Sequence, residues 1–351
     1  MGQWQKPHIF QELESHGHTI HLFNAVAYST FEQANDELIK YIKTTKINFQ
    51  LFINSFGSER LFPETVLEIK RAGIKTLLIC FDNLHAPFMH KAIAPNFDLV
   101  WLTSIENKDM FKHWGCNIIF MPYAANPNKF APQYNLEIPR VGFIGSPYGV
   151  RAIKINQLLK HHIKCQIYSQ AVFDGKVGRS NFVDLLKSTI SLTQFKIGRQ
   201  IIKGAIKKQF FSSEEVSLIN SPDLERKPSV SFEQMNYLYS NLAISLGITE
   251  LRNTYTLKTP IHKIHLRTFE IPMCGGLQLS SYSDELAEYF EEDKEIILYK
   301  SVDEMVSKAQ FYLKDENKRL RETMKRHARH RAESDHSWMN RFNRIFKLLS
   351  I

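Results

Sequence analysis

The chain has 351 residues, of which 43% are hydrophobic and 23% are charged. This balance is typical of a globular protein and excludes a disordered or fibrous chain. The length fits about two domains, and no apolar run approaches the roughly 20 residues that are needed to span a bilayer. The formal net charge of +9 favours anionic partners, which could be nucleotide diphosphates, anionic lipids or nucleic acid.

The cellular compartment is indicated by the first residues and by the cysteines. The first twelve residues alternate polar and apolar side chains without a signal-peptide core, so we expect no export. Cys80, Cys116, Cys165 and Cys274 lie far apart and have no C-x-x-C spacing. We therefore expect reduced, buried thiols and a cytoplasmic protein.

The first half of the chain alternates helix and strand signals. We expect helices over Gln3 to Ser15, after the capping box Ser29-Thr30-Phe31-Glu32, from Pro63 to Gly73, and from a cap at Ser104 to Gly115. We expect strands at Thr19 to Phe23, Phe49 to Ile53, Lys75 to Cys80, Leu99 to Leu102 and Asn117 to Met121. Apolar strands that are covered by helices on both sides describe a doubly wound parallel sheet. The usual first strand and its glycine-rich turn would precede Gln3, so either the chain starts late or the domain lacks that strand.

The proline-containing stretch Pro122 to Pro139 breaks the alternation and is expected to link two domains. Arg140 to Gly149 then predicts a strand and a glycine-bearing turn, followed by a helix through Leu159 and a strand at Ile163 to Tyr168. The remaining expected elements are helix Ser231 to Tyr239, strand Leu242 to Leu246, helix Asp284 to Phe290, strand Glu295 to Tyr299, a helix opened by the capping box Ser301-Val302-Asp303-Glu304, helix Asp315 to Ala332, and a helical stripe of Trp338, Phe342, Ile345 and Leu349.

The stretch His265 to Ser280 predicts a short helix that carries Glu270, is stopped by Gly275 and Gly276, and leads into an apolar strand. Small ligands bind in α/β sheets where strand ends meet helix starts. A carboxylate there would repel phosphate, so it suits the hydroxyls of a ribose or a sugar. Alternatively, Glu270 is an ordinary acidic residue that the helix dipole favours. Pro272 is expected in the first helical turn, where its missing N–H is not needed.

This stretch resembles a known enzyme family. The pattern Arg267-x-Phe269-Glu270-Ile271-Pro272-x-Cys274-Gly275-Gly276 is similar to the CgeB-like (spore maturation protein) glycosyltransferases, which are relatives of the nucleotide-sugar glycosyltransferases with the GT-B fold. The resemblance is strongest from Arg140 onward. It implies an α/β protein with two Rossmann-like doubly wound domains that face each other across a cleft. Residues 1–136 would bind the acceptor, residues 137–332 would bind the nucleotide sugar, and a helix in residues 333–351 would cross back to the first domain.

The resemblance also implies a set of donor-binding residues. Glu270 would contact the ribose, and Arg267 could neutralise a diphosphate leaving group, although a structural ion pair is an alternative. Gly145 and Ser146 lie in the turn of the first β-α-β unit of this domain. Gly275 and Gly276 permit close approach of a ligand, although helix termination explains at least one of them.

In the wider retaining relatives, an E-x7-E pattern places a second glutamate before the one that matches Glu270. That position is His262 in this chain, so the resemblance does not imply a retaining mechanism. His262 could gather positive charge beside the phosphates together with Lys258, Lys263 and His265. Equally, these four residues could form an edge that faces solvent.

Candidate catalytic residues follow a strand in the first domain. Asp82 and His85 lie just after Lys75 to Cys80, at the carboxyl end of the strand, where ligands bind in such sheets. Either residue could act as the general base that deprotonates an acceptor hydroxyl, and the ordinary pKa of histidine suits that role. The alternatives are an Asx turn for Asp82 and a surface histidine for His85.

The segment from Leu185 to Phe211 contains no acidic residue and mixes lysine and arginine with isoleucine, leucine and phenylalanine. Such a segment could lie on an anionic membrane surface, or it could be a solvated basic helix.

The missing motifs narrow the function further. There is no D-x-D motif, so we expect no metal dependence. The absence of P-loop and G-x-G-x-x-G motifs argues against a P-loop enzyme and against a dinucleotide dehydrogenase. We expect a glycosyltransferase that moves a sugar from a nucleoside diphosphate sugar to an acceptor hydroxyl of a glycan or lipid-linked saccharide, with no further cofactor. It would be cytoplasmic or peripheral at the inner membrane face, with no nucleic-acid partner. The alternatives are a nucleotide-sugar epimerase or hydrolase of the same fold, and a non-catalytic nucleotide-sugar- or RNA-binding protein.

Overall fold

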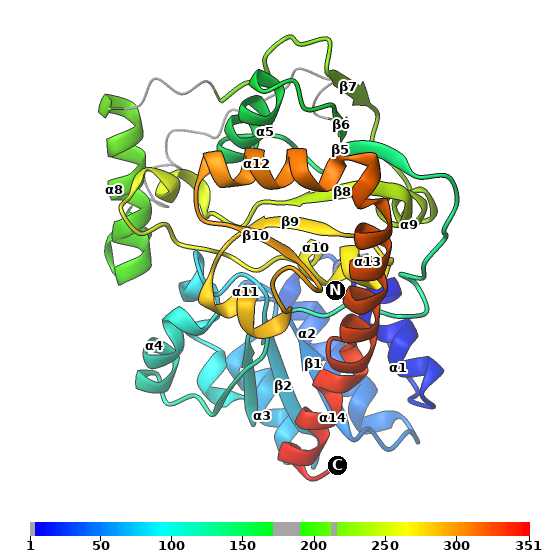
Figure 1. Cartoon of the computed structure of the whole chain (residues 1–351). Helices are drawn as coiled ribbons and strands as arrows, with labels where there is room; N and C mark the ends of the chain where they lie inside the picture. The colour runs from blue at the N-terminus through cyan, green and yellow to red at the C-terminus, as the bar shows by residue number, and fades with distance from the viewer. Residues whose placement is uncertain (1–3, 171–189, 212–215) are drawn as a thin grey trace. The chain divides into compact units, whose positions relative to one another are not determined.

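The computed structural model describes residues 4–170, 190–211 and 216–351. The chain divides into two compact units. Unit 1 comprises Met1–Tyr123 together with Trp338–Ile351, and unit 2 comprises Ala124–Ser337. Figure 1 shows the elements of each unit.

Unit 1 is built on a four-stranded parallel sheet. Its strands, in the order β1-β2-β3-β4, are β1 (Leu51–Asn54), β2 (Lys75–Cys80), β3 (Leu99–Leu102) and β4 (Ile118–Phe120). Its main helices are η1 (Lys6–Phe10), α1 (Gln11–Ser15), α2 (Phe31–Thr44), α3 (Pro63–Arg71), α4 (Lys108–His113) and α14 (Trp338–Leu349). Right-handed crossovers between strands in sequential order place the connecting helices on one face of the sheet. Accordingly, Ile69 of α3 and Phe111 of α4 share a buried core with Leu78 and Val100.

The other face of this sheet is covered by the end of the chain. Neighbouring residues of a strand point to opposite faces, so Trp101 of β3 points away from the core that contains Val100. Its ring centroid lies 5.9 Å from those of both Trp338 and Phe342 on α14. The carboxylate of Glu12 accepts hydrogen bonds from the first backbone N–H groups of α14, those of Trp338 and Met339.

We predict that Trp338→Ala lowers the free energy of unfolding of unit 1 by about 3 to 5 kcal/mol, because it leaves a large cavity. Trp338 is fully buried, whereas Leu348 on the same helix is 59% exposed. Urea unfolding followed by circular dichroism measures the loss, and Leu348→Ala is the matched control. Equal effects of the two substitutions would contradict this role of α14.

Two details of unit 1 differ from the sequence-based expectations. The predicted strand Thr19 to Phe23 is wrong: the segment is irregular and largely exposed, and β1 pairs only with β2. The helix caps also move. The hydroxyl of Thr30 caps α2 by accepting a hydrogen bond from Gln33 N at 3.2 Å. The side chain of Ser104 makes no cap bond, and α4 begins only at Lys108, after a 3₁₀ turn.

Unit 2 is built on a six-stranded parallel sheet in the order β10-β9-β8-β5-β6-β7. Its strands are β5 (Ile138–Ile144), β6 (Cys165–Tyr168), β7 (Leu224–Lys227), β8 (Leu242–Gly247), β9 (Gln278–Ser281) and β10 (Ile297–Tyr299). From β5 the chain first builds outward to β7, and it then returns to β8 and builds in the opposite direction. The sheet is therefore doubly wound, with its topological switch point between β5 and β8.

Helices cover both faces of this sheet. They are α5 (Val150–Lys160), α8 (Lys196–Phe211), η6 (Arg252–Thr256, a 3₁₀ helix), α9 (Phe232–Asn241), α10 (Arg267–Met273), α11 (Asp284–Tyr289), α12 (Val302–Leu313) and α13 (Lys318–Asp335). On one face, Leu158 of α5 and Met305 of α12 share a core with Ile244 and Leu279. Helix α10 packs against β8, β9 and α13, and Figure 1 shows α5 and α12 next to each other.

Two features of unit 2 differ from the sequence-based expectations. Strand β7 was not predicted, because Leu-Glu-Arg-Lys at a half-exposed sheet edge lacks an apolar alternation. Pro272 lies near the carboxyl end of α10 rather than in its first turn, and it is tolerated because the helix ends one residue later. Of the predicted cationic segment, residues 185–189 lie outside the described residues.

Candidate functional site

The carboxyl ends of β5 and β8, at the switch point of the unit 2 sheet, are where ligands bind in doubly wound folds. Gly145 follows β5 with φ +136°. The Nη2 atom of Arg267 donates a hydrogen bond to the carbonyl of Ile144 at 2.6 Å. A Cβ at position 145 would lie 2.5 Å from that Nη2 atom. Glycine is therefore needed for Arg267 of α10 to lie over the turn after β5.

A second guanidinium lies beside the first. Arg151, at the start of α5, donates a hydrogen bond to the carbonyl of Ser146 at 3.2 Å. Arg151 and Arg267 both approach the ring of Phe143, at 5.8 and 4.7 Å from its centroid. Burial lowers the pKa of Arg151, and the positive charge of Arg267 lowers it further.

In the part of the chain that the structure describes, neither guanidinium has a carboxylate within ion-pair distance. Two like charges held together at partly buried positions destabilise each other. An anion placed against both would remove that repulsion, and a guanidinium matches the geometry of phosphate oxygens. This end of the sheet is therefore suited to binding a phosphate or diphosphate.

Glu270 lies one helical turn after Arg267 on α10 and is 8% exposed. Burial raises its pKa to about 7, and the positive charge of Arg267 opposes the rise. The structure thus places a buried carboxyl group next to Arg267. At neutral pH this group is divided between its neutral and its ionised form.

His262 belongs to a hydrogen-bonded chain of side chains around the loop between β8 and α10. Its Nδ1 lies 2.8 Å from Thr249 Oγ1, which lies 2.9 Å from Ser281 Oγ. Ser281 donates to Glu250 Oε2 at 2.9 Å, and Lys154 Nζ lies 3.3 Å from Glu250 Oε1. Burial lowers the pKa of His262, so the ring is held neutral.

The sequence analysis missed Arg151, Lys154, Thr249 and Glu250. Arg151 and Lys154 are separated by three positions, so a helical reading of Val150–Lys160 places them on one face and could have identified them. Nothing in the sequence indicates that Glu250 meets Lys154, or that Thr249 meets Ser281, because these pairs lie far apart along the chain.

Gly275 and Gly276 lie at the opposite end of α10 from Arg267. Their N–H groups donate to the carbonyls of Pro272 and Ile271 at 2.8 and 2.9 Å and so terminate the helix. The helix end accounts for the φ of +68° at Gly275. Their contact with a ligand stays a prediction.

In unit 1, Asp82 and His85 lie just beyond the carboxyl end of β2. His85 Nε2 is 3.9 Å from Asp82 Oδ1. Their loop is fixed by the fully buried Asn83, whose side chain bonds the backbone of Thr103 and Ser104. These contacts hold the loop in place between β2 and β3.

A second histidine lies nearby in unit 1. Burial lowers the pKa of His90, and the negative charges of Glu59 and Asp82 oppose that shift. The sequence analysis did not single out His90. The carboxyl ends of β1 and β2 thus hold two histidines and two carboxylates.

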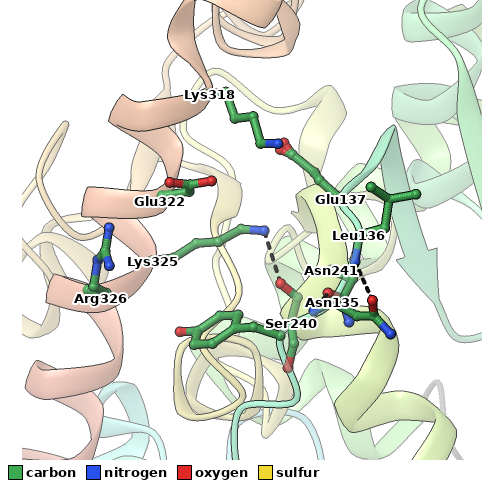
Figure 2. A pocket seen from close by; sticks show the side chains of 10 residues that line it. Asn135, Leu136, Glu137, Ser240, Asn241, Lys318, Glu322, Lys325 and Arg326 are labelled. Atoms are coloured by element: carbon green, nitrogen blue, oxygen red, sulfur yellow. Dashed lines mark hydrogen bonds between the residues drawn. The ribbon is translucent and has the colours of Figure 1, made fainter.

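A cavity of about 500 Å³ lies at the amino ends of the strands of the unit 2 sheet, where β5 and β8 begin. In Figure 2, Lys325 of α13 points toward Ser240, and its Nζ donates to the carbonyls of Ser240 and Leu242. Burial lowers the pKa of Lys325 to about 8. Beside it, Arg321 forms a buried ion pair with Glu137. These cations are occupied by groups that anchor α13, so we assign the cavity a structural role.

Among the described residues, no three His, Cys, Asp or Glu side chains are grouped so that they could hold a metal ion. In residues 4–170, 190–211 and 216–351, no helix combines the length and the hydropathy that are needed to cross a bilayer.

Comparisons with known proteins agree with this architecture. Residues 197–347 match the family model described as "Glycosyl transferase-like". Anabaena HepE, solved in complex with UDP-glucose, is 13% identical, with a TM-score of 0.57 over 97% of this chain and 88% of HepE. The fold of this chain, with its two parallel sheets, is that of the GT-B glycosyltransferases.

Two further solved structures agree. A glycosyltransferase from Rickettsia africae is 11% identical, with a TM-score of 0.56 over 97% of this chain and 87% of that one. The sucrose-phosphate synthase of Thermosynechococcus elongatus is 13% identical, with a TM-score of 0.51 over 92% and 79% of the two chains. No curated protein sequence matches the chain. The expected α/β class with two parallel sheets is thus confirmed, and the chain carries a glycosyl transferase-like domain.

Proposed function

We propose that the protein transfers a sugar from a nucleoside diphosphate sugar to an acceptor hydroxyl. The observation that carries this proposal is the pair of adjacent guanidiniums, Arg151 and Arg267, at the switch point of the unit 2 sheet. The complex of HepE with UDP-glucose, a protein of the same fold, supports a donor of this class. The pattern around Glu270 supports a closer relationship to the CgeB-like enzymes.

Each donor-side residue has a proposed role. Arg151 and Arg267 bind the diphosphate and stabilise the negative charge that develops on it as the sugar leaves. Glu270 accepts hydrogen bonds from the ribose hydroxyls. His262, held neutral by burial, offers one hydrogen bond to a hydroxyl of the donor sugar. Because the two guanidiniums already neutralise the diphosphate, we propose that transfer needs no metal ion and continues in EDTA.

For the acceptor we propose unit 1. His85, beside Asp82, accepts the proton of the attacking hydroxyl. The acceptor would be a glycan or a lipid-linked saccharide of surface polysaccharide synthesis. The four buried, free cysteines support a reducing, cytoplasmic location.

A thermal-shift screen of nucleotides and nucleotide sugars tests the donor class, because a ligand that binds only the native state raises its apparent stability. Incubating the protein with UDP-, GDP- and dTDP-sugars, with and without candidate saccharide acceptors, then tests the reaction. Release of nucleoside diphosphate that depends on the acceptor is the expected result. Isomerisation of the donor without any acceptor would instead indicate an epimerase.

We predict that His85→Gln lowers kcat by about 10²- to 10⁴-fold, because a general base contributes that much. The affinity for the nucleoside diphosphate should stay unchanged, because the residue belongs to unit 1. The exposed His113 of the same unit provides the control substitution, His113→Gln. An unchanged kcat in His85→Gln would remove His85 from the mechanism.

A further inference from the structure

Helix α8 has two dissimilar halves. In its first half, Ile197 and Ile201 are buried, and the helix packs against η6. The contact is close, because a Cβ at Gly204 would lie 2.7 Å from the carbonyl oxygen of Asn253. The second half is exposed: Ile206 is 52% and Phe210 is 74% exposed. One end of α8 is therefore anchored in unit 2, and the other presents apolar side chains to the surroundings.

The charges of this helix are all of one sign. Residues 190–211 contain five lysine or arginine residues and no acidic residue. None of these cations has a carboxylate partner within the residues that the structure describes. Lys207 donates to the carbonyl of Thr256 of η6, and the nearby Lys258 and Arg252 are exposed as well. The helix and its neighbouring loop thus form a continuous cationic surface.

The apolar and basic side chains share one face. Residues at spacings of three and four lie on the same side of a helix, so Lys203, Ile206, Lys207 and Phe210 point the same way. On this face two large apolar side chains, Ile206 and Phe210, are exposed one helical turn apart beside the lysines. A nucleic-acid surface needs positive charge but not exposed aliphatic groups. A face that combines both is typical of helices that lie in the plane of a membrane.

We propose that α8 docks unit 2 onto an anionic membrane surface. Ile206 and Phe210 enter the boundary between headgroups and acyl chains, and Lys203 and Lys207 contact the anionic headgroups.

Docking also concerns the donor site. Helix η6 lies in the loop between Glu250 and His262, so α8 rests on the segment that leads from β8 to the site. Given the proposed glycosyltransferase function, a lipid-linked acceptor would be held at the same surface.

Vesicle flotation with the full chain tests the proposal, using vesicles of phosphatidylcholine alone and vesicles mixed equally with phosphatidylglycerol. Wild type should bind the anionic vesicles and not the neutral ones. Ile206→Ser combined with Phe210→Ser should lower binding at least about tenfold. Lys203→Gln combined with Lys207→Gln should lower it about twentyfold and weaken its salt dependence.

Leu348→Ser and Lys318→Gln, at exposed positions elsewhere, are the matched controls and should bind as wild type does. Circular dichroism and the thermal shift by UDP, measured on the same variants, report folding and donor binding separately. A failure of the proposed function is therefore distinguishable from a failure of membrane docking. Equal binding to neutral vesicles, or α8 variants that bind like wild type, would overturn the proposal. So would an RNA oligomer that displaces the vesicles and binds the Ile206/Phe210 variant as tightly as wild type.

Discussion

Glu270→Gln will make the free protein more stable at about pH 8 and will weaken its binding to UDP. Burial raises the pKa of Glu270 from 4.5 to about 7, so ionising this group costs free energy in the folded state. At about pH 8 the wild type bears that cost, of the order of 3 kcal/mol, and glutamine does not. Glutamine keeps one acceptor oxygen but replaces the other with an NH2 donor and loses the negative charge, so we expect UDP affinity to fall about ten- to a hundredfold.

The raised pKa of Glu270 determines whether stability rises or falls with pH. Between pH 4.5 and about 7 the folded state binds more protons at Glu270 than the unfolded state does. The free energy of unfolding of the wild type therefore falls as the pH rises through this range. The difference in the free energy of unfolding between Glu270→Gln and wild type should be small below pH 4.5. It should reach its full size above about pH 7.

Urea unfolding at several pH values, together with calorimetric titration of UDP, measures both effects. The exposed Glu288, changed to glutamine, is the matched control and should alter neither quantity. If Glu270→Gln destabilised the protein at about pH 8 and bound UDP as well as wild type, Glu270 would be a structural residue.

Arg151→Ala will weaken binding of UDP about ten- to a hundredfold and leave binding of uridine unchanged. Hydrogen bonds to charged groups contribute roughly 1.5 to 3 kcal/mol each, and only UDP carries the diphosphate. Arg267→Ala should have the same selectivity, with an added loss of stability because its bond to Ile144 disappears. Arg151→Lys should fall in between, because lysine keeps the charge but lacks the planar fork of donors.

Titration calorimetry of each variant with UDP and with uridine measures the ratio of the two affinities. The exposed Arg319 provides the control, Arg319→Ala. A parallel loss of UDP and uridine affinity in Arg151→Ala would show that this arginine supports the fold of the site and not the diphosphate.

The strands and helices of both sheets followed largely from sequence patterns, because buried strands such as Lys75–Cys80 are apolar runs and helices such as Val302–Leu313 begin after a capping serine. The predictions failed where pairing with a neighbouring strand, or exposure at a sheet edge, decides whether a segment forms a strand. Thr19 to Phe23 has strand-like residues but pairs with no strand in the described part of the chain, and Leu224–Lys227 forms a strand without an apolar pattern.

The residues of the candidate site were likewise predicted only in part from the sequence. Arg267, Glu270 and Gly145 were found because they lie at the ends of elements whose type the sequence predicts. That Arg267 lies over Gly145 depends on the strand order, which places α10 beside the end of β5. Arg151 was missed because a single arginine in a helix is common, and only the fold brings it to the Phe143 ring.

A crystal structure of the protein with UDP tests the central claim most directly. We expect the diphosphate between the guanidiniums of Arg151 and Arg267, at the carboxyl ends of β5 and β8, with the ribose within hydrogen-bond distance of Glu270. Binding of UDP in the cavity at Lys325, or with the ribose away from Glu270, would contradict the account.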